Sequence, residues 1–169
     1  MLKGIKTKTA HYFIDENNLK QGEYKDFYVN GQLWEHAFYQ NGNPHGEFKS
    51  YHDNGQLWIH TFYLNGKQHG EYKVYHENGQ LWEHAFYQNG NRHGERKIYR
   101  KNGNLWLHAF CQNGQLHGEY KRYSEDGILD YATFYYQNKD LNVNPCTLSE
   151  QDKAYIMISG RLPPRDQPC

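Results

Sequence analysis

A block of 24 residues repeats along this chain, and this period constrains the fold more than any other feature. The block from Gly70 to His93 reads GEYKVYHENGQLWEHAFYQNGNRH, and close copies precede and follow it. Five copies begin 24 residues apart, at Gly22, Gly46, Gly70, Gly94 and Gly118. A fixed period in this range indicates a repeat architecture, in which each small unit packs against the next one.

Two turn signals divide each repeat. In the third repeat they are Asn78-Gly79, which we call the first turn, and Asn89-Gly90, the second turn. Asn-Gly between alternating segments is the strongest short signal for a β-hairpin, because both central residues of a type I′ turn need a positive φ. Two such turns in 24 residues predict short antiparallel strands. A parallel β-helix could share this period, but its connections do not require tight hairpins.

The expected fold is therefore all-β: an elongated, single-layer, twisted antiparallel β-meander built from 24-residue hairpin repeats, with a short C-terminal capping helix. An N-terminal half-repeat cap, with a missing or atypical first strand, is expected at residues 1–21, and the C-terminal helix and tail at 142–169. The five repeats are expected at residues 22–45, 46–69, 70–93, 94–117 and 118–141.

The last repeat departs from the others, and the sequence after it has the pattern of a helix. Thr147 to Glu150 resembles a capping box, apolar residues follow, and Gly160 is expected to end the helix. The simplest role for such a helix is to cover the last strand and prevent edge-to-edge pairing of sheets.

Period-2 alternation assigns the side chains to two faces of the sheet. The pairs expected on one face of the third repeat, which we call the Trp/Phe face, are Tyr75 with Trp82, Lys73 with His84 and Glu71 with Phe86. The residues expected on the opposite face, the Tyr face, are Tyr72, Val74, Leu81, Glu83, Ala85 and Tyr87.

The Trp/Phe face is nearly identical from copy to copy, whereas the Tyr face varies. We therefore expect the Trp/Phe face to hold the stack together, and the Tyr face or the sheet edges to select partners. The lysine stems are expected to lie on the tryptophans. Each histidine is expected near the glutamate of the following repeat, as in His60 near Glu71.

A single sheet has no second layer to bury its other face, although stable domains normally have two layers. At least one aromatic face must then be covered by a second copy, by a protein partner, or by strong curling of the sheet. The sequence therefore suggests a non-enzymatic scaffold that self-associates or binds a protein, and a membrane-surface module for phospholipid headgroups is the alternative. The candidate binding residues are Trp34, Trp58, Trp82, Trp106, Tyr51, Tyr75, Tyr99, His60 and His84.

Charge and composition limit the other classes of function. The 19 basic and 19 acidic residues balance, and a glutamate neighbours the lysine of each repeat, so nucleic-acid binding is not expected and lipid binding is disfavoured. The mean hydropathy is very low, but 16 Tyr, 8 Phe and 4 Trp indicate a folded chain. The start lacks the apolar run of a signal peptide, and free thiols are expected at Cys111, Cys146 and Cys169. The expected location is the cytoplasm.

Neither catalysis nor a cofactor is expected. The His-Gly-Glu motif occurs at His45, His69, His93 and His117, but a catalytic site is one asymmetric group of residues in a pocket, not a recurring one. The 11 histidines also suggest zinc. Equivalent histidines lie two strands apart, however, at about 9–10 Å, which is too far for them to share one ion.

The segment Tyr87-Gln-Asn-Gly-Asn-Arg-His-Gly-Glu95 resembles the MORN (membrane occupation and recognition nexus) repeat, and the resemblance covers about residues 12–141. The longer unit is similar to the variant form common in bacterial and giant-virus proteins. The resemblance implies an elongated, twisted, single-layer antiparallel sheet. It also implies a protein-interaction or oligomerisation module, with lipid binding claimed for some members.

Overall fold

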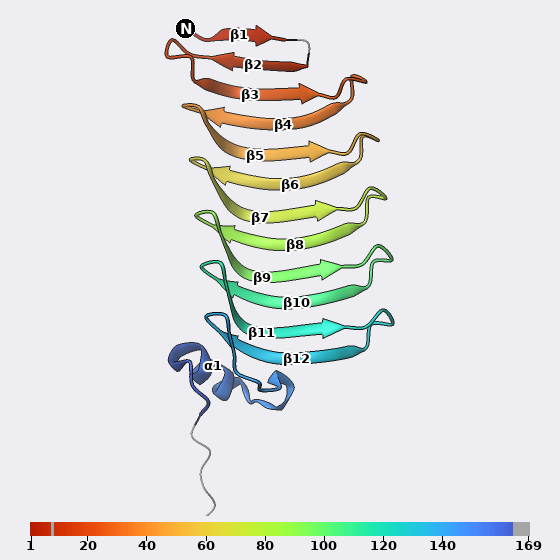
Figure 1. The fold of residues 1–169 in the computed structure, drawn as a ribbon. Helices are drawn as coiled ribbons and strands as arrows, with labels where there is room; N and C mark the ends of the chain where they lie inside the picture. Colours follow the sequence, from red (N-terminus) through yellow and green to blue (C-terminus); the bar gives the residue numbers. More distant parts are fainter. Residues whose placement is uncertain (8, 164–169) are drawn as a thin grey trace, which may run out of the picture.

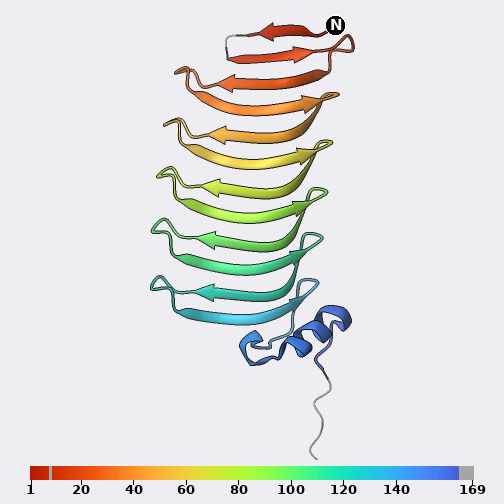
Figure 2. The same ribbon diagram turned by 180° about the vertical axis from the view of Figure 1, so that it is seen from behind.

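One antiparallel sheet extends through nearly the whole molecule, with the N-terminus at one end and a helix at the other (Figures 1 and 2). The computed structural model describes residues 1–7 and 9–163, and in these residues the sheet has 13 strands in sequence order. The predicted single-layer meander is therefore confirmed. The strands are β1 (Lys3–Lys6), β2 (Ala10–Ile14), β3 (Lys20–Phe27), β4 (Leu33–Gln40), β5 (Asn43–Tyr51), β6 (Leu57–Leu64), β7 (Lys67–Tyr75), β8 (Leu81–Gln88), β9 (Asn91–Tyr99), β10 (Leu105–Gln112), β11 (Gln115–Tyr123), β12 (Leu129–Tyr136) and β13 (Lys139–Asp140).

The second turns are the predicted two-residue hairpin turns. In the third repeat Asn89 and Gly90 both have positive φ, 52° and 86°, as a type I′ turn requires. The amide of Gly90 also donates a hydrogen bond of 2.8 Å to the carbonyl of Gln68, at the start of the preceding hairpin's return strand. Matching bonds join Gly42 to Lys20, Gly66 to Pro44 and Gly114 to Arg92, so successive second turns are linked through the backbone.

The first turns are longer than predicted. β7 ends at Tyr75 and β8 begins at Leu81, and of Asn78 and Gly79 only the glycine has a positive φ. The amide of Gly79 bonds to the carbonyl of His76, and the amide of His76 bonds to that of Gln80. This is the pattern of a three-residue loop that ends in a glycine bulge.

The longer loop changes part of the predicted register. Lys73 does pair with His84, and Glu71 pairs with Phe86. Tyr75, however, pairs with Leu81 and not with Trp82, because the register shifts by one residue next to the turn. The predicted Tyr75–Trp82 pair is therefore wrong.

The glycine of each His-Gly-Glu motif lies at a β-bulge. Between β6 and β7 the register shifts from Thr61–Tyr72 to Tyr63–Gln68, and Gly70 lies in the extra segment with a φ of 90°. A side chain is strained in that conformation, so the recurring glycine is explained by backbone geometry.

The core lies on the Tyr face, which corrects the expectation that the Trp/Phe face holds the stack together. Ala85 is 1% exposed, whereas Trp82 is 44% exposed. Rings on the Tyr face close over the small central residues, as in the edge-to-face pair of Tyr72 and Tyr87, with centroids 5.2 Å apart. The buried residues on this face include Ala37, Ser50, Thr61, Val74, Glu83, Ala85, Ile98, Leu107, Ala109 and Thr133.

The C-terminal region forms the 3₁₀ helix η1 (Pro145–Thr147) and the helix α1 (Glu150–Ser159). The capping box of α1 pairs Ser149 with Asp152, two residues after the predicted Thr147 to Glu150. Gly160 ends the helix in the left-handed conformation, as expected. α1 lies at the β12 end of the sheet (Figures 1 and 2), where it contacts β11, while η1 contacts β12.

The other end of the sheet is formed by β1, the short first strand of the N-terminal region. Its four residues pair with β2, and lysines occupy both of its ends, which discourages pairing with another sheet. In the part of the chain that the structure describes, no helix is both long enough and apolar enough to cross a bilayer.

Candidate functional site

A Lys–Glu–His cluster recurs on the Trp/Phe face. In the third repeat Oε1 of Glu71 lies 2.8 Å from Nζ of Lys73 and 2.9 Å from Nε2 of His84. Lys73 and then His84 lower the pKa of the Glu71 carboxyl, and partial burial opposes them. The same cluster forms around Glu23, Glu47 and Glu95.

Each histidine binds the glutamate of its own repeat, not that of the next one. Nε2 of His60 lies 2.9 Å from Glu47, so the expected His60–Glu71 contact is wrong. Lys49 pairs directly with His60 across the first-turn hairpin, which places Glu47 diagonally beside the imidazole. On the second-turn side the bulge at Gly70 separates the two strands' side chains.

A column of phenylalanines runs beside these clusters. Phe38, Phe62 and Phe86 are each 36–37% exposed, and the ring of His84 packs on that of Phe86 with centroids 5.1 Å apart. The imidazole is thus fixed between a carboxylate and an apolar ring.

The four tryptophans form a second row, next to the first turns. Their neighbours are rings of the same repeat, such as His52 against Trp58 at 5.6 Å, or the guanidinium of Arg100 above Trp106. The lysines expected on the tryptophans instead bind the glutamates, because a carboxylate is the stronger partner for an ammonium group. The tryptophans Trp34, Trp58, Trp82 and Trp106 are 38–44% exposed.

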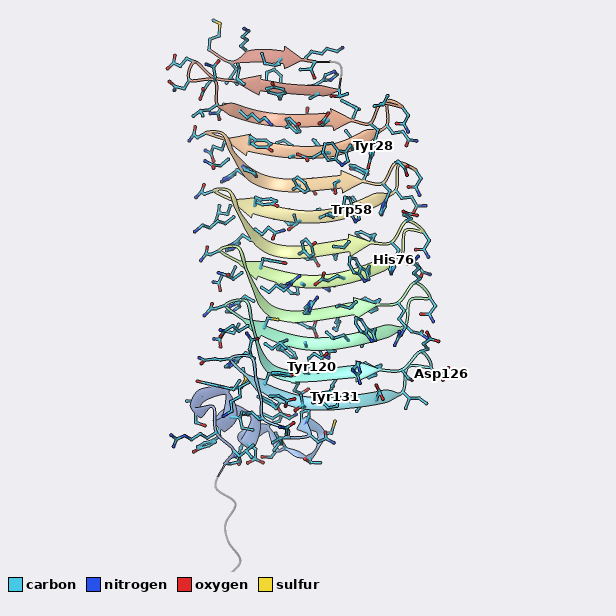
Figure 3. All side chains as sticks on the ribbon, in the orientation of Figure 1. Tyr28, Trp58, His76, Tyr120, Asp126 and Tyr131 are labelled. Carbon is cyan, nitrogen blue, oxygen red and sulfur yellow. The ribbon has the colours of Figure 1, made fainter. Side chains whose placement is uncertain are left out.

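A shallow cleft of about 380 Å³ separates Trp58 from Trp82. Tyr75 and His76 line it, and Nε2 of His52 lies 3.1 Å from the carbonyl of Tyr75. In Figure 3 Tyr28, Trp58 and His76 lie one below another beside the first turns. Contacts of this kind join one repeat to the next at the end of the strands where the tryptophans lie.

The candidate binding residues thus fall into two groups. Trp58, Tyr75 and Trp82 meet around one cleft, and the half-buried Tyr51 and Tyr99 occupy the position of Tyr75 in neighbouring repeats. His60 and His84 lie farther along their strands, in the carboxylate clusters. Their role in binding stays a prediction.

A charged cluster on the Tyr face was not predicted. Glu83 is only 5% exposed and accepts a hydrogen bond of 2.7 Å from Nε of Arg96, with Arg92 at 3.4 Å. Burial and then Glu83 raise the pKa of the Tyr72 hydroxyl to about 12. The signal for this cluster was available, because Arg96 breaks the aromatic pattern of its position and Glu83 replaces the apolar residue found in the next repeat.

The surroundings of His117 and of the cysteines are those of structural residues. His117 packs on Tyr136 with centroids 5.0 Å apart, and burial lowers its pKa despite a hydrogen bond to the Met157 backbone. Cys111 is buried and Cys146 exposed, both as free thiols, while Cys169 lies outside the described residues. Within residues 1–7 and 9–163, no three His, Cys, Asp or Glu side chains are grouped so as to hold a metal ion.

Replacing Trp82 with alanine should lower the free energy of unfolding by only about 1 kcal/mol, between the surface and the core range. The reason is that almost half of the side chain already contacts solvent. Urea unfolding followed by circular dichroism measures this change. Trp58→Ala should give the same value within a few tenths of a kcal/mol, because its exposure is similar. A loss of about 2–4 kcal/mol would instead mean that the Trp/Phe face is covered.

Comparison with known sequences gives one family. A family model described as MORN repeat variant matches five consecutive segments, residues 20–41, 44–67, 68–89, 92–110 and 116–138. Together these segments span the sheet from β3 to β12. No curated protein matches the chain.

Proposed function

The chain belongs to the MORN repeat family, in its variant form, and on this premise we propose that it is a non-enzymatic scaffold that binds a protein through the Trp/Phe face. MORN repeats are generally associated with binding to proteins or membranes. The observation that carries the proposal is the exposure of the two aromatic rows. Seven side chains, each at least about a third exposed, share one face: Trp34, Trp58, Trp82, Trp106, Phe38, Phe62 and Phe86.

Exposed apolar side chains that gather on one face mark an interaction site. Histidine rings pack on the phenylalanines, and a ring or a guanidinium of the same repeat packs on each tryptophan, so these side chains lose less conformational entropy on binding than unpacked ones would. Charge supports a protein over a lipid headgroup. Each lysine of the face already binds a carboxylate, as Lys73 binds Glu71, which leaves little positive charge for an anionic surface. The proposed setting is the cytoplasm, where thiols such as Cys111 stay reduced.

The test compares the proteins retained by the wild-type chain and by the variant Trp58→Ala/Trp82→Ala from an extract of the native source. We expect the variant to lose at least about 90% of a specifically retained protein, a tenfold effect that corresponds to about 1.4 kcal/mol. The matched control is Lys67→Ala/Asn91→Ala, which changes two exposed residues at the other end of the strands. This control should retain the same protein as the wild type.

Two further measurements separate the alternatives. Light scattering at micromolar concentration reports self-association, and co-sedimentation with anionic vesicles reports lipid binding. Equal retention by the wild type and the Trp58→Ala/Trp82→Ala variant would refute the proposed face. Vesicle binding that depends on the tryptophans and disappears at high salt would support the membrane-surface function instead.

A further inference from the structure

The fifth repeat shows how the Trp/Phe face accommodates a helix. Here Ala132 replaces the histidine of the other repeats, and Nζ of Lys153 in α1 lies 2.8 Å from Oε1 of Glu119. Lys121 binds the other oxygen of the same carboxylate. The ammonium group of α1 therefore replaces the imidazole as the second partner of this glutamate.

The apolar residues of α1 complete this contact. Phe134, at the position of the exposed Phe86, is only 2% exposed, and Ile156 of α1 is completely buried. Sδ of Met157 lies 3.8 Å from the point where a Cβ of Gly118 would be, beside Phe110. One turn of helix thus presents a lysine followed at i+3 and i+4 by apolar side chains.

The preceding repeats offer the same partners without a helix on them. Phe86 is 37% exposed, and the Glu71 carboxylate beside it is about one-third exposed. Lys73 and His84 both contact Oε1 of Glu71, so Oε2 is left to accept a further charged hydrogen bond. The same holds around Phe38 with Glu23 and around Phe62 with Glu47.

The spacing of the column matches the repeat of a helix. Equivalent phenylalanines lie two strands apart, at about 9.6 Å. Seven residues of an α-helix rise about 10.5 Å, so a helix inclined by about 25° to the column would meet each phenylalanine once per heptad. Three exposed phenylalanines then require about four turns of helix.

We propose that Phe38, Phe62 and Phe86, together with the adjacent glutamates, form a track for an amphipathic helix of a partner protein. The helix carries an apolar residue every seven positions, with a lysine or arginine three or four residues before it. This inference rests on the proposed function and names the class of partner. The α1 helix of a second copy does not fit this description, because its Lys153 and Ile156 are held against its own sheet.

The probe is a synthetic 21-residue peptide that repeats the Lys, Ile and Met arrangement of α1 in each heptad, with glutamine and alanine at the other positions. Fluorescence anisotropy of the labelled peptide measures its affinity for the complete chain. We expect saturable binding to the wild type, at least tenfold weaker binding to Phe62→Ala/Phe86→Ala, and a smaller salt dependence for Glu47→Gln/Glu71→Gln. Lys67→Ala/Asn91→Ala should bind as the wild type does, and circular dichroism verifies that each variant is folded.

Equal binding of a scrambled peptide, or unchanged binding by Phe62→Ala/Phe86→Ala, would overturn the inference, and so would the absence of binding to the wild type. Loss of self-association or of vesicle binding in Phe62→Ala/Phe86→Ala, without loss of peptide binding, would assign the column to a second copy or to a lipid surface. If the peptide fails while a native protein is still retained through Trp58 and Trp82, the helix inference fails and the proposed function stands. If both fail, the proposed function fails as well.

Discussion

Replacing Phe134 with alanine is expected to lower the free energy of unfolding by about 3–5 kcal/mol, the largest effect of any single substitution considered for this chain. The side chain is 2% exposed, and its cross-strand partner Glu119 binds Lys153 of α1. Its removal leaves a cavity in addition to the lost burial of the ring. Urea unfolding monitored by circular dichroism and by tryptophan fluorescence measures the change.

Phe86→Ala is a matched control, because Phe86 occupies the same position two repeats earlier and differs chiefly in its exposure of 37%. Its expected cost is about 1 kcal/mol. If the two substitutions cost the same, burial under α1 is not what distinguishes the positions. Deletion of α1 should reduce the cost of Phe134→Ala towards that of Phe86→Ala.

Replacing Glu83 with leucine is expected to cost about 2–3 kcal/mol. The carboxylate is buried and accepts the hydrogen bond from Arg96, so its loss leaves a partly buried guanidinium without its counter-charge. The expected cost lies below that of a fully buried pair, because a quarter of the Arg96 side chain contacts water. Leucine itself fits the site, since Leu107 occupies the same position in the next repeat.

The double variant Glu83→Leu/Arg96→Tyr should recover most of this loss. It converts the charged pair to the leucine and tyrosine that other repeats carry at these positions, and apolar replacement of a buried ion pair is often neutral or stabilising. Arg96→Tyr alone should be destabilising, because Glu83 then keeps only the longer contact to Arg92. A double-mutant cycle on unfolding free energies measures the coupling. Additive effects would show that Glu83 and Arg96 do not stabilise one another.

The repeat sequence was sufficient to predict the strand order and much of the pairing. The pairs Lys73–His84 and Glu71–Phe86 follow from alternation once the hairpin is recognised. The pair Tyr75–Trp82 did not form, because Asn-Gly suits more than one loop, and in the first turn Asn78 keeps a negative φ. The length of a loop depends on the backbone of all its residues, which the dipeptide alone does not determine.

The sequence did not reveal which face is buried. Tyr and Trp are both amphipathic, so aromatic columns on two faces give no preference. The preference comes from the small residues Ala85 and Thr61, over which neighbouring rings can close. The near-identity of the Trp/Phe face from repeat to repeat was misleading. The residues that recur there form the partly exposed Lys–Glu–His clusters and not a core. The contact of Lys153 with Glu119 joins residues far apart in the chain, and no local pattern indicates it.

The hydrogen bonds between successive second turns have a consequence for how such a chain could change length. The bonds from Gly42, Gly66, Gly90 and Gly114 use only main-chain atoms, so a duplicated 24-residue unit that kept its Asn-Gly turn would reproduce them. Duplication of an internal unit would therefore lengthen the molecule by about 9.6 Å without any new complementary surface. The terminal helix is different, because it depends on Ala132 and Glu119 of one particular unit. Growth by duplication is thus compatible with this architecture in its interior, while the C-terminal end stays the same.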